Sequence, residues 1–158
     1  MMSTMRKACV DNVADKDFDN RVVFVRVDFN VPIDTATGAI LNDARIRQSI
    51  PTINYLQKKG AKIVLCSHLG RPGGKIRSEL SLKNIVPRLS ALLHDHVEFV
   101  DDCIGDGVEK AAAALQKSKV LLLENIRFYP EEELNDPEFA FRLIKGIGAT
   151  VFVNDGFR

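Results

Sequence analysis

Three short polar runs contain the residue types that hold small anions. They are Arg26-Val-Asp-Phe-Asn-Val-Pro32, Ser67-His-Leu-Gly-Arg-Pro72 and Leu123-Glu-Asn-Ile-Arg-Phe128. Each run follows or ends an apolar stretch that is typical of a buried strand, and in an open parallel sheet ligands bind beyond the carboxyl ends of the strands. Arginine binds carboxylate and phosphate groups in a bidentate way that lysine cannot copy. The runs therefore predict a site for a small polyanion.

The candidate site residues come from these runs and from the start of the first predicted helix. Arg26, Asp28 and Asn30 share one face of an extended segment because successive side chains alternate. Asp28 is suited to accept a hydrogen bond from a hydroxyl group of the same ligand. The other candidates are Arg45 at the helix start, His68 and Arg71 in a glycine-rich loop, and Arg127. A helix start also favours an anion through its free amide groups and its dipole.

Spacing alone leaves a second interpretation of these residues open. A single arginine at a strand end is usually solvated or paired in a surface salt bridge. Several cationic groups at the same end of one predicted sheet favour a phosphate site. Both interpretations stand at this point.

Other motifs do not develop into a site. The run Gly70–Lys75 is one residue short of a phosphate-binding loop, and Ile76 stands where Ser or Thr is required. His94-Asp-His96 has no further metal ligands nearby in sequence, and we expect a hydrated loop there. Glu131-Glu-Glu133 is typical of a solvated turn or a helix start. We therefore predict no metal site and no cofactor-binding residues in this chain.

Composition narrows the class of protein. The 158 residues carry 22 Lys plus Arg and 21 Asp plus Glu, a net charge of +1, which argues against nucleic-acid or membrane-surface partners. The odd, widely spaced Cys9, Cys66 and Cys103 are typical of unpaired thiols in a reducing compartment. No secretory signal or membrane-spanning stretch is expected. These observations predict a cytoplasmic protein, with a plastid as the alternative because a removed transit peptide leaves no trace.

Apolar runs and helical patterns alternate along the chain. The predicted strands are Val22–Val25, Ile63–Cys66, Val120–Leu123 and Val151–Val153, with Val97–Val100 as a weaker fifth. Helical patterns cover Ile46–Leu56, Leu82–Leu93, Val108–Leu115 and the segment after Asp136-Pro137. This order predicts a Rossmann-like α/β fold, a doubly wound parallel sheet with helices on both faces. Residues 1–20 are a polar lead-in and 21–158 the domain.

Local signals refine three of these helices. Gly60 is a stop signal for the first, and Pro51 inside its pattern predicts a bend or a late start. Ser81 is placed to cap the second helical segment, and Asp136 followed by a proline is placed to cap the fourth.

Over residues 21–155 the sequence resembles the N-terminal, phosphoglycerate-binding domain of phosphoglycerate kinase, and the three polar runs carry the resemblance. The resemblance implies reversible phosphoryl transfer between ATP and 3-phosphoglycerate, giving ADP and 1,3-bisphosphoglycerate. The implied substrate-binding residues are Arg26, Asp28, Asn30, Arg45, His68, Leu69, Gly70, Arg71 and Arg127. Among them, Arg45 is the implied catalytic residue, which stabilises the charge of the transferred group.

The sequence departs from the family pattern after the last predicted strand. The family reads Asn-Asp-Ala-Phe-Gly and continues, whereas this sequence reads Asn154-Asp-Gly-Phe-Arg158. We therefore expect a domain that is incomplete at its C-terminal end and lacks the nucleotide-binding domain. The residues that bind MgATP or MgADP are then outside this chain, and the chain alone is expected to bind phosphoglycerate weakly and to be inactive.

Two functions follow from this departure. The first is that the chain is part of a glycolytic or Calvin-cycle phosphoglycerate kinase, which the retained polar cluster favours. The second is an inactive truncated homologue that serves as a binding or structural subunit of a larger assembly. The family is usually monomeric, but an unclosed sheet exposes apolar surface and predicts a partner that covers the open edge.

Overall fold

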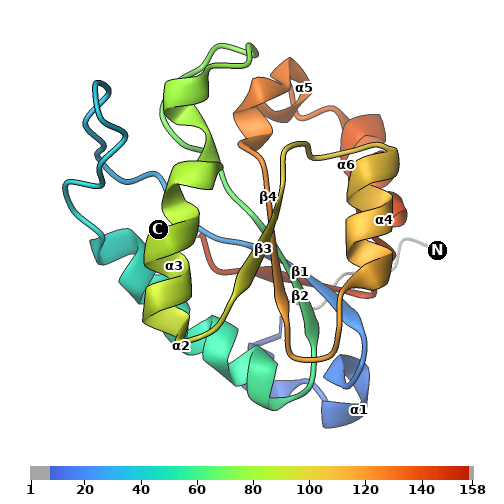
Figure 1. The fold of residues 1–158 in the computed structure, drawn as a ribbon. Coiled ribbons are helices and arrows are strands. Elements are labelled where there is room, and N and C mark those ends of the chain that lie inside the picture. Colours follow the sequence, from blue (N-terminus) through green and yellow to red (C-terminus); the bar gives the residue numbers. More distant parts are fainter. Residues whose placement is uncertain (1–7, 157–158) are drawn as a thin grey trace.

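The computed structural model of the chain describes residues 8–156 and contains a sheet of 5 parallel strands (Figure 1). The strands are β1 (Val22–Arg26), β2 (Lys62–Cys66), β3 (Val97–Val100), β4 (Val120–Leu123) and β5 (Val151–Asn154), in the order β3-β4-β2-β1-β5. All of the predicted strands are present. Of the two positions where the sequence departs from the family pattern, Gly156 is described, whereas Arg158 lies outside the described residues together with Phe157 and residues 1–7 of the predicted lead-in.

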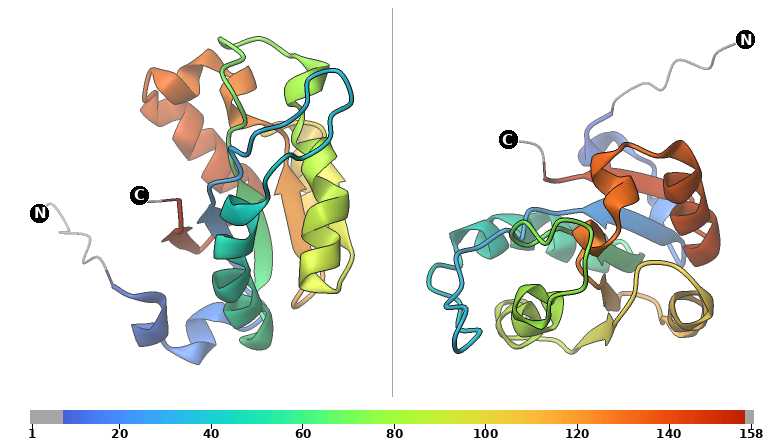
Figure 2. Two further views of the ribbon diagram at one scale, coloured as in Figure 1. Left: turned by 90° about the vertical axis from the view of Figure 1, so that its left-hand side faces the viewer. Right: turned by 90° about the horizontal axis from the view of Figure 1, so that it is seen from above.

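Helices cover both faces of the sheet, which confirms the predicted doubly wound α/β fold. The α-helices are α1 (Asp15–Phe18), α2 (Ala44–Lys58), α3 (Val86–Leu93), α4 (Asp106–Ala114), α5 (Pro130–Glu133) and α6 (Pro137–Ile147). Short 3-10 helices are η1 (Val10–Asn12), η2 (Ser78–Leu80), η3 (Leu82–Ile85) and η4 (Ile126–Phe128). Helices α2 and α3 lie on one face, and α4 and α6 lie on the other (Figure 2).

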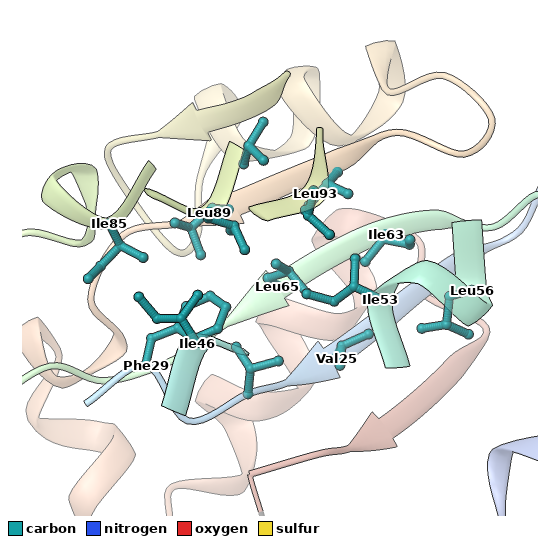
Figure 3. Packing of buried hydrophobic residues seen from close by; sticks show 14 of the residues in the cluster. Val25, Phe29, Ile46, Ile53, Leu56, Ile63, Leu65, Ile85, Leu89 and Leu93 are labelled. Atoms are coloured by element: carbon teal, nitrogen blue, oxygen red, sulfur yellow. The ribbon is translucent and has the colours of Figure 1, made fainter. Parts of the chain in front are cut away.

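The apolar strands are explained by burial on both faces. Along β2, Ile63 and Leu65 point into the core under α2 and α3, whereas Val64 and Cys66 point into the core under α4 and α6. Figure 3 shows the first of these cores, with Leu65 close to Ile53 of α2. Because both sides of the strand are covered, the sequence shows a continuous apolar run in place of an alternating one.

Helix ends follow the sequence signals, with one exception. The side chain of Ser81 accepts from the N–H of Lys83, and that of Asp136 accepts from the N–H of Glu138, so both predicted caps are confirmed. Helix α2 begins at Ala44 and runs through Pro51, so the late start offered as an alternative is wrong. Pro51 and Arg47 are both exposed, so the carbonyl group of Arg47, which the proline leaves without a donor, belongs to a solvent-facing part of the helix.

The segment before β1 packs onto the domain. Phe18 of α1 is fully buried, and its ring meets Tyr55 of α2 edge to face at 6.4 Å between centroids. The N–H of Asn20 donates to the carbonyl oxygen of Gly60 at 2.9 Å. Val10 and Val13 also pack against the core under α2 and α3, so apolar side chains anchor the described part of the predicted polar lead-in.

Candidate functional site

The three polar runs meet at one end of the sheet because β4, β2 and β1 are neighbours in it. Two buried side chains, Ser67 and Asn125, join the loops that follow these strands. The hydroxyl of Ser67 accepts from the N–H of Phe29 at 2.9 Å and donates to the carbonyl oxygen of His68 at 2.9 Å. The loop after β1 is thus fixed to the loop after β2.

Asn125 fixes the loop after β2 to the loop after β4. Its Nδ2 donates to the carbonyl oxygens of Leu69 and Leu80 at 2.8 and 2.9 Å. Its Oδ1 accepts from the N–H groups of Arg127 and Leu69 at 3.1 and 3.3 Å. Every polar atom of this buried amide is satisfied, so Asn125 holds the backbone from which Arg127 projects.

Glu124 connects the loop after β4 to the start of η3. Its carboxylate accepts from the hydroxyl of Ser81 at 2.6 Å and from the N–H groups of Leu82 and Asn125 at 2.9 and 2.7 Å. Ser67, Glu124 and Asn125 were absent from the sequence-based list of site residues. Their signal was available, because polar residues that directly follow a wholly apolar strand are placed to organise its carboxyl end.

The first group of predicted residues surrounds Arg45. Its Nη1 lies 3.2 Å from the Asp28 carboxylate and donates to the carbonyl oxygen of Asn30 at 3.1 Å. The side-chain oxygen of Asn30 accepts from the N–H of Gly70 at 2.8 Å. Gly70 has a φ of +63°, and a Cβ there would lie 2.8 Å from Leu80, so this close turn requires glycine.

The second group is centred on Arg26. Its Nη2 lies 3.2 Å from Nδ1 of His68 and 3.2 Å from Oε1 of Glu132. The other oxygen of Glu132 accepts from Nε of Arg127 at 3.1 Å. One carboxylate therefore pairs with two of the predicted arginines.

This pairing corrects the interpretation of Glu131-Glu-Glu133. The run follows Pro130 in the first turn of the short helix α5, but Glu132 is not a solvated residue, since its side chain is only 17% exposed. Arg26 of β1 and Glu132 of α5 are far apart in the sequence but form an ion pair in the fold. The local sequence gives no sign of that contact.

The pKa of His68 is lowered by its surroundings. Partial burial and the neighbouring guanidinium groups of Arg127 and Arg26 lower its pKa to about 4, against which Glu132 and Asp28 act in the opposite direction. The ring is therefore neutral near pH 7, and within the described residues it forms a hydrogen bond with Arg26.

The remaining predicted residues differ in their access to the site. Arg71 is exposed and forms no ion pair within the described residues 8–156. The side chain of Leu69 is buried in the core, and its backbone N–H and carbonyl groups both bind Asn125. Leu69 therefore shapes the loop and offers no free polar group of its own.

No nucleotide-phosphate loop forms at the glycine-rich segment. The run Gly70–Lys75 continues into the three-residue η2, so no long helix start follows it, and a Cβ on Gly74 would lie 2.9 Å from Pro130. Within residues 8–156 no three His, Cys, Asp or Glu side chains gather in a way that could hold a metal ion. Among the described helices, none is long and apolar enough to cross a membrane.

Comparison with known proteins gives one consistent result. The sequence model of the family described as phosphoglycerate kinase matches residues 13–158. Phosphoglycerate kinase of Microcystis aeruginosa is 50% identical over 97% of this chain, and the cytosolic enzyme of Triticum aestivum is 54% identical over 96%. The chloroplastic enzyme of Volvox carteri is 50% identical over 96% of the chain. The chain spans 38%, 37% and 32% of these relatives, respectively.

Solved structures agree with the sequence relatives. Phosphoglycerate kinase from Pyrococcus horikoshii superposes with a TM-score of 0.77 and 35% identity, covering 89% of this chain and 35% of that one. The enzyme from Coxiella burnetii gives a TM-score of 0.78 at 32% identity, covering 93% and 34%. The chain therefore belongs to the phosphoglycerate kinase family.

Proposed function

We propose that this chain forms the phosphoglycerate-binding part of a phosphoglycerate kinase, which transfers a phosphoryl group reversibly between ATP and 3-phosphoglycerate. The observation that carries the proposal is the joining of the three polar runs into one braced cationic cluster at the carboxyl end of the sheet. Membership of the family supports the same substrate, or its 1,3-bisphospho form.

Several hydrogen-bond donors of the cluster are not used by the described residues and can bind an anion. Arg127 uses only Nε in its ion pairs with described residues, and Arg45 uses only Nη1. The end of the Arg127 fork and the whole guanidinium group of Arg71 can thus bind phosphate in a bidentate way. Asp28, whose carboxylate lies 3.2 Å from Nη1 of Arg45, is the proposed acceptor for a substrate hydroxyl.

Arg45 is the proposed catalytic residue. Phosphoryl transfer is catalysed mainly by positioning and by stabilising charge on the transferred group. Asp28 and the Asn30 carbonyl group hold one nitrogen of Arg45, which fixes the direction of the guanidinium group before substrate arrives. MgATP is the co-substrate in this proposal, and the described residues offer no phosphate loop for it.

We further propose a cytoplasmic location, with the plastid as the alternative, and a monomer as the state of the whole enzyme. The relatives named above include a cytosolic and a chloroplastic enzyme. The balanced charge of the chain supports a small-molecule substrate over nucleic acid or a membrane surface.

Calorimetric titration of the chain with 3-phosphoglycerate tests the proposal. The variant Arg71→Met is expected to weaken binding by about tenfold or more, because a charge-assisted contact to phosphate is lost. Arg77→Met is the matched control, since Arg77 is an exposed arginine of the same loop region that pairs locally with Glu79. Equal binding by both variants, or no binding by the unaltered chain at millimolar substrate, would contradict the proposed function.

A further inference from the structure

The contact between Arg26 and His68 determines which nitrogen of the imidazole ring carries a proton. Nη2 of Arg26 lies 3.2 Å from Nδ1 of His68. A guanidinium group is a donor only and cannot accept a hydrogen bond. Nδ1 must therefore be the acceptor in this pair, and the proton of the uncharged ring lies on Nε2.

We infer that Arg26 is a positioning residue that fixes His68 as the Nε2–H tautomer, so that His68 donates one hydrogen bond to the anionic substrate. The donation to substrate rests on the proposed function, whereas the tautomer does not. No described residue accepts from Nε2, which leaves this donor for a ligand. Arg26 itself acts through His68 and is not counted among the groups that contact phosphate.

Arg26 is held in place from three sides, which is why it can set the tautomer. Its Nη1 approaches the sulfur of buried Cys66 at 3.9 Å, and its Nη2 pairs with Glu132 at 3.2 Å as well as with His68. Its backbone pairs with Cys66 of β2 and Asn154 of β5. The guanidinium group therefore has little freedom to turn away from the ring.

The charges around His68 agree with an uncharged ring. Arg26 on β1 and Arg127 on η4 disfavour a second proton, and Glu132 on α5 and Asp28 after β1 favour it. Burial is the largest cause of the low pKa, the two cations lower it further, and the pKa falls to about 4. A protonated ring would also lose the bond from Arg26, because both nitrogens of an imidazolium group are donors.

Nitrogen NMR of the imidazole ring in the ligand-free chain tests the inference directly. The expected spectrum at pH 7 has a protonated Nε2 and an unprotonated Nδ1 for His68, with His68→Gln used for assignment. A proton on Nδ1, a rapidly averaged pair of tautomers, or a doubly protonated ring would each overturn the inference. The tautomer is read from the unaltered chain, and His68→Gln serves only to assign the resonances of the ring.

Two arginine variants separate the hydrogen bond from the charge. Arg26→Met removes both, so we expect averaged tautomers and a higher pKa of His68. Arg127→Met removes a cation that also lowers this pKa but has no hydrogen bond with the ring within the described residues, so the pKa should rise while the Nε2–H tautomer persists. An unchanged tautomer pattern in Arg26→Met would refute the positioning role.

Addition of 3-phosphoglycerate then separates this inference from the proposed function. A shift of the Nε2–H resonance, with Nδ1 unchanged, is expected if the ring donates to the substrate. If the substrate binds and the Nε2–H resonance does not move, the donor role of His68 is wrong. If no substrate binds and the ligand-free tautomer is the expected one, the proposed function fails while the role of Arg26 stands.

Discussion

Each arginine in the cluster, apart from Arg71, is held by a carboxylate or a backbone carbonyl group. Asp28 pairs with Arg45, and Glu132 pairs with both Arg26 and Arg127. Such pairing reduces the repulsion between like charges while the site is free of ligand. It also fixes the guanidinium planes, so that less conformational entropy is lost when an anion binds.

Replacement of Glu132 tests this arrangement at the level of one residue. Glu132→Ala leaves two partly buried arginines without their shared acceptor, and we expect a loss of about 1–3 kcal/mol in the free energy of unfolding. Urea denaturation monitored by circular dichroism measures the loss. Glu133→Ala is the control, because Glu133 is 52% exposed and 3.7 Å from Arg127, and its effect should stay within about 0.5 kcal/mol. Similar losses in both variants would count against the bridging role.

The low pKa of His68 makes stability depend on pH. The unfolded chain binds this proton near the ordinary pKa of 6.5, whereas the folded chain binds it near 4. The folded state is therefore at no disadvantage above pH 6.5, and stability is lost as pH falls from 6.5 towards 4. Solvent screening at this half-buried ring limits the loss to about 1 kcal/mol. Between pH 6.5 and 4 the denaturation midpoint of the unaltered chain should fall more than that of His68→Gln, and parallel curves would exclude His68 as the source.

At the scale of elements, we expect the removal of two helix caps to lower the free energy of unfolding by different amounts. Asp136→Ala removes one ordinary cap of α6 and should cost about 1 kcal/mol. Ser81→Ala removes the cap of η3 and also the hydroxyl that donates to buried Glu124 at 2.6 Å, so we expect a larger loss, about 2 kcal/mol or more. Thermal unfolding of both variants measures the difference. An equal or smaller loss in Ser81→Ala would mean that Glu124 is satisfied by its backbone donors alone.

The same elements show what could be predicted from sequence and why. Strands such as β2 were predictable because burial on both faces leaves a continuous apolar run, and Ser81 and Asp136 were predictable because capping is local. Pro51 was misleading, since its cost depends on whether the helix face is solvated. The bridge from Glu132 to Arg26 joins positions 106 residues apart, and no local pattern encodes such a contact.

At the scale of the whole molecule, the β5 side of the sheet is the least covered. A groove of about 680 Å³ lies between β5 and α6, and it extends as far as Arg26 and Glu132. Phe24 and Phe152 form part of its wall and stack at 5.5 Å between ring centroids. Phe152 is 59% exposed on an edge strand, so the described fold presents an aromatic surface beside the proposed anion site.

This surface predicts binding of apolar probes and a tendency to self-associate. Phe152→Gln should lower the fluorescence of the dye ANS and the light scattering of concentrated chain, because it removes the exposed ring that walls the groove. It should also cost about 0.5–1.5 kcal/mol through loss of the stacked pair. Phe141→Gln is the control, since Phe141 is 62% exposed on α6 but does not line the groove. If both variants reduce dye binding equally, total exposed aromatic area controls association and the groove does not. If only Phe152→Gln reduces dye binding, the exposed β5 side is the surface through which the chain self-associates. This is the outcome expected for a sheet with an uncovered edge strand.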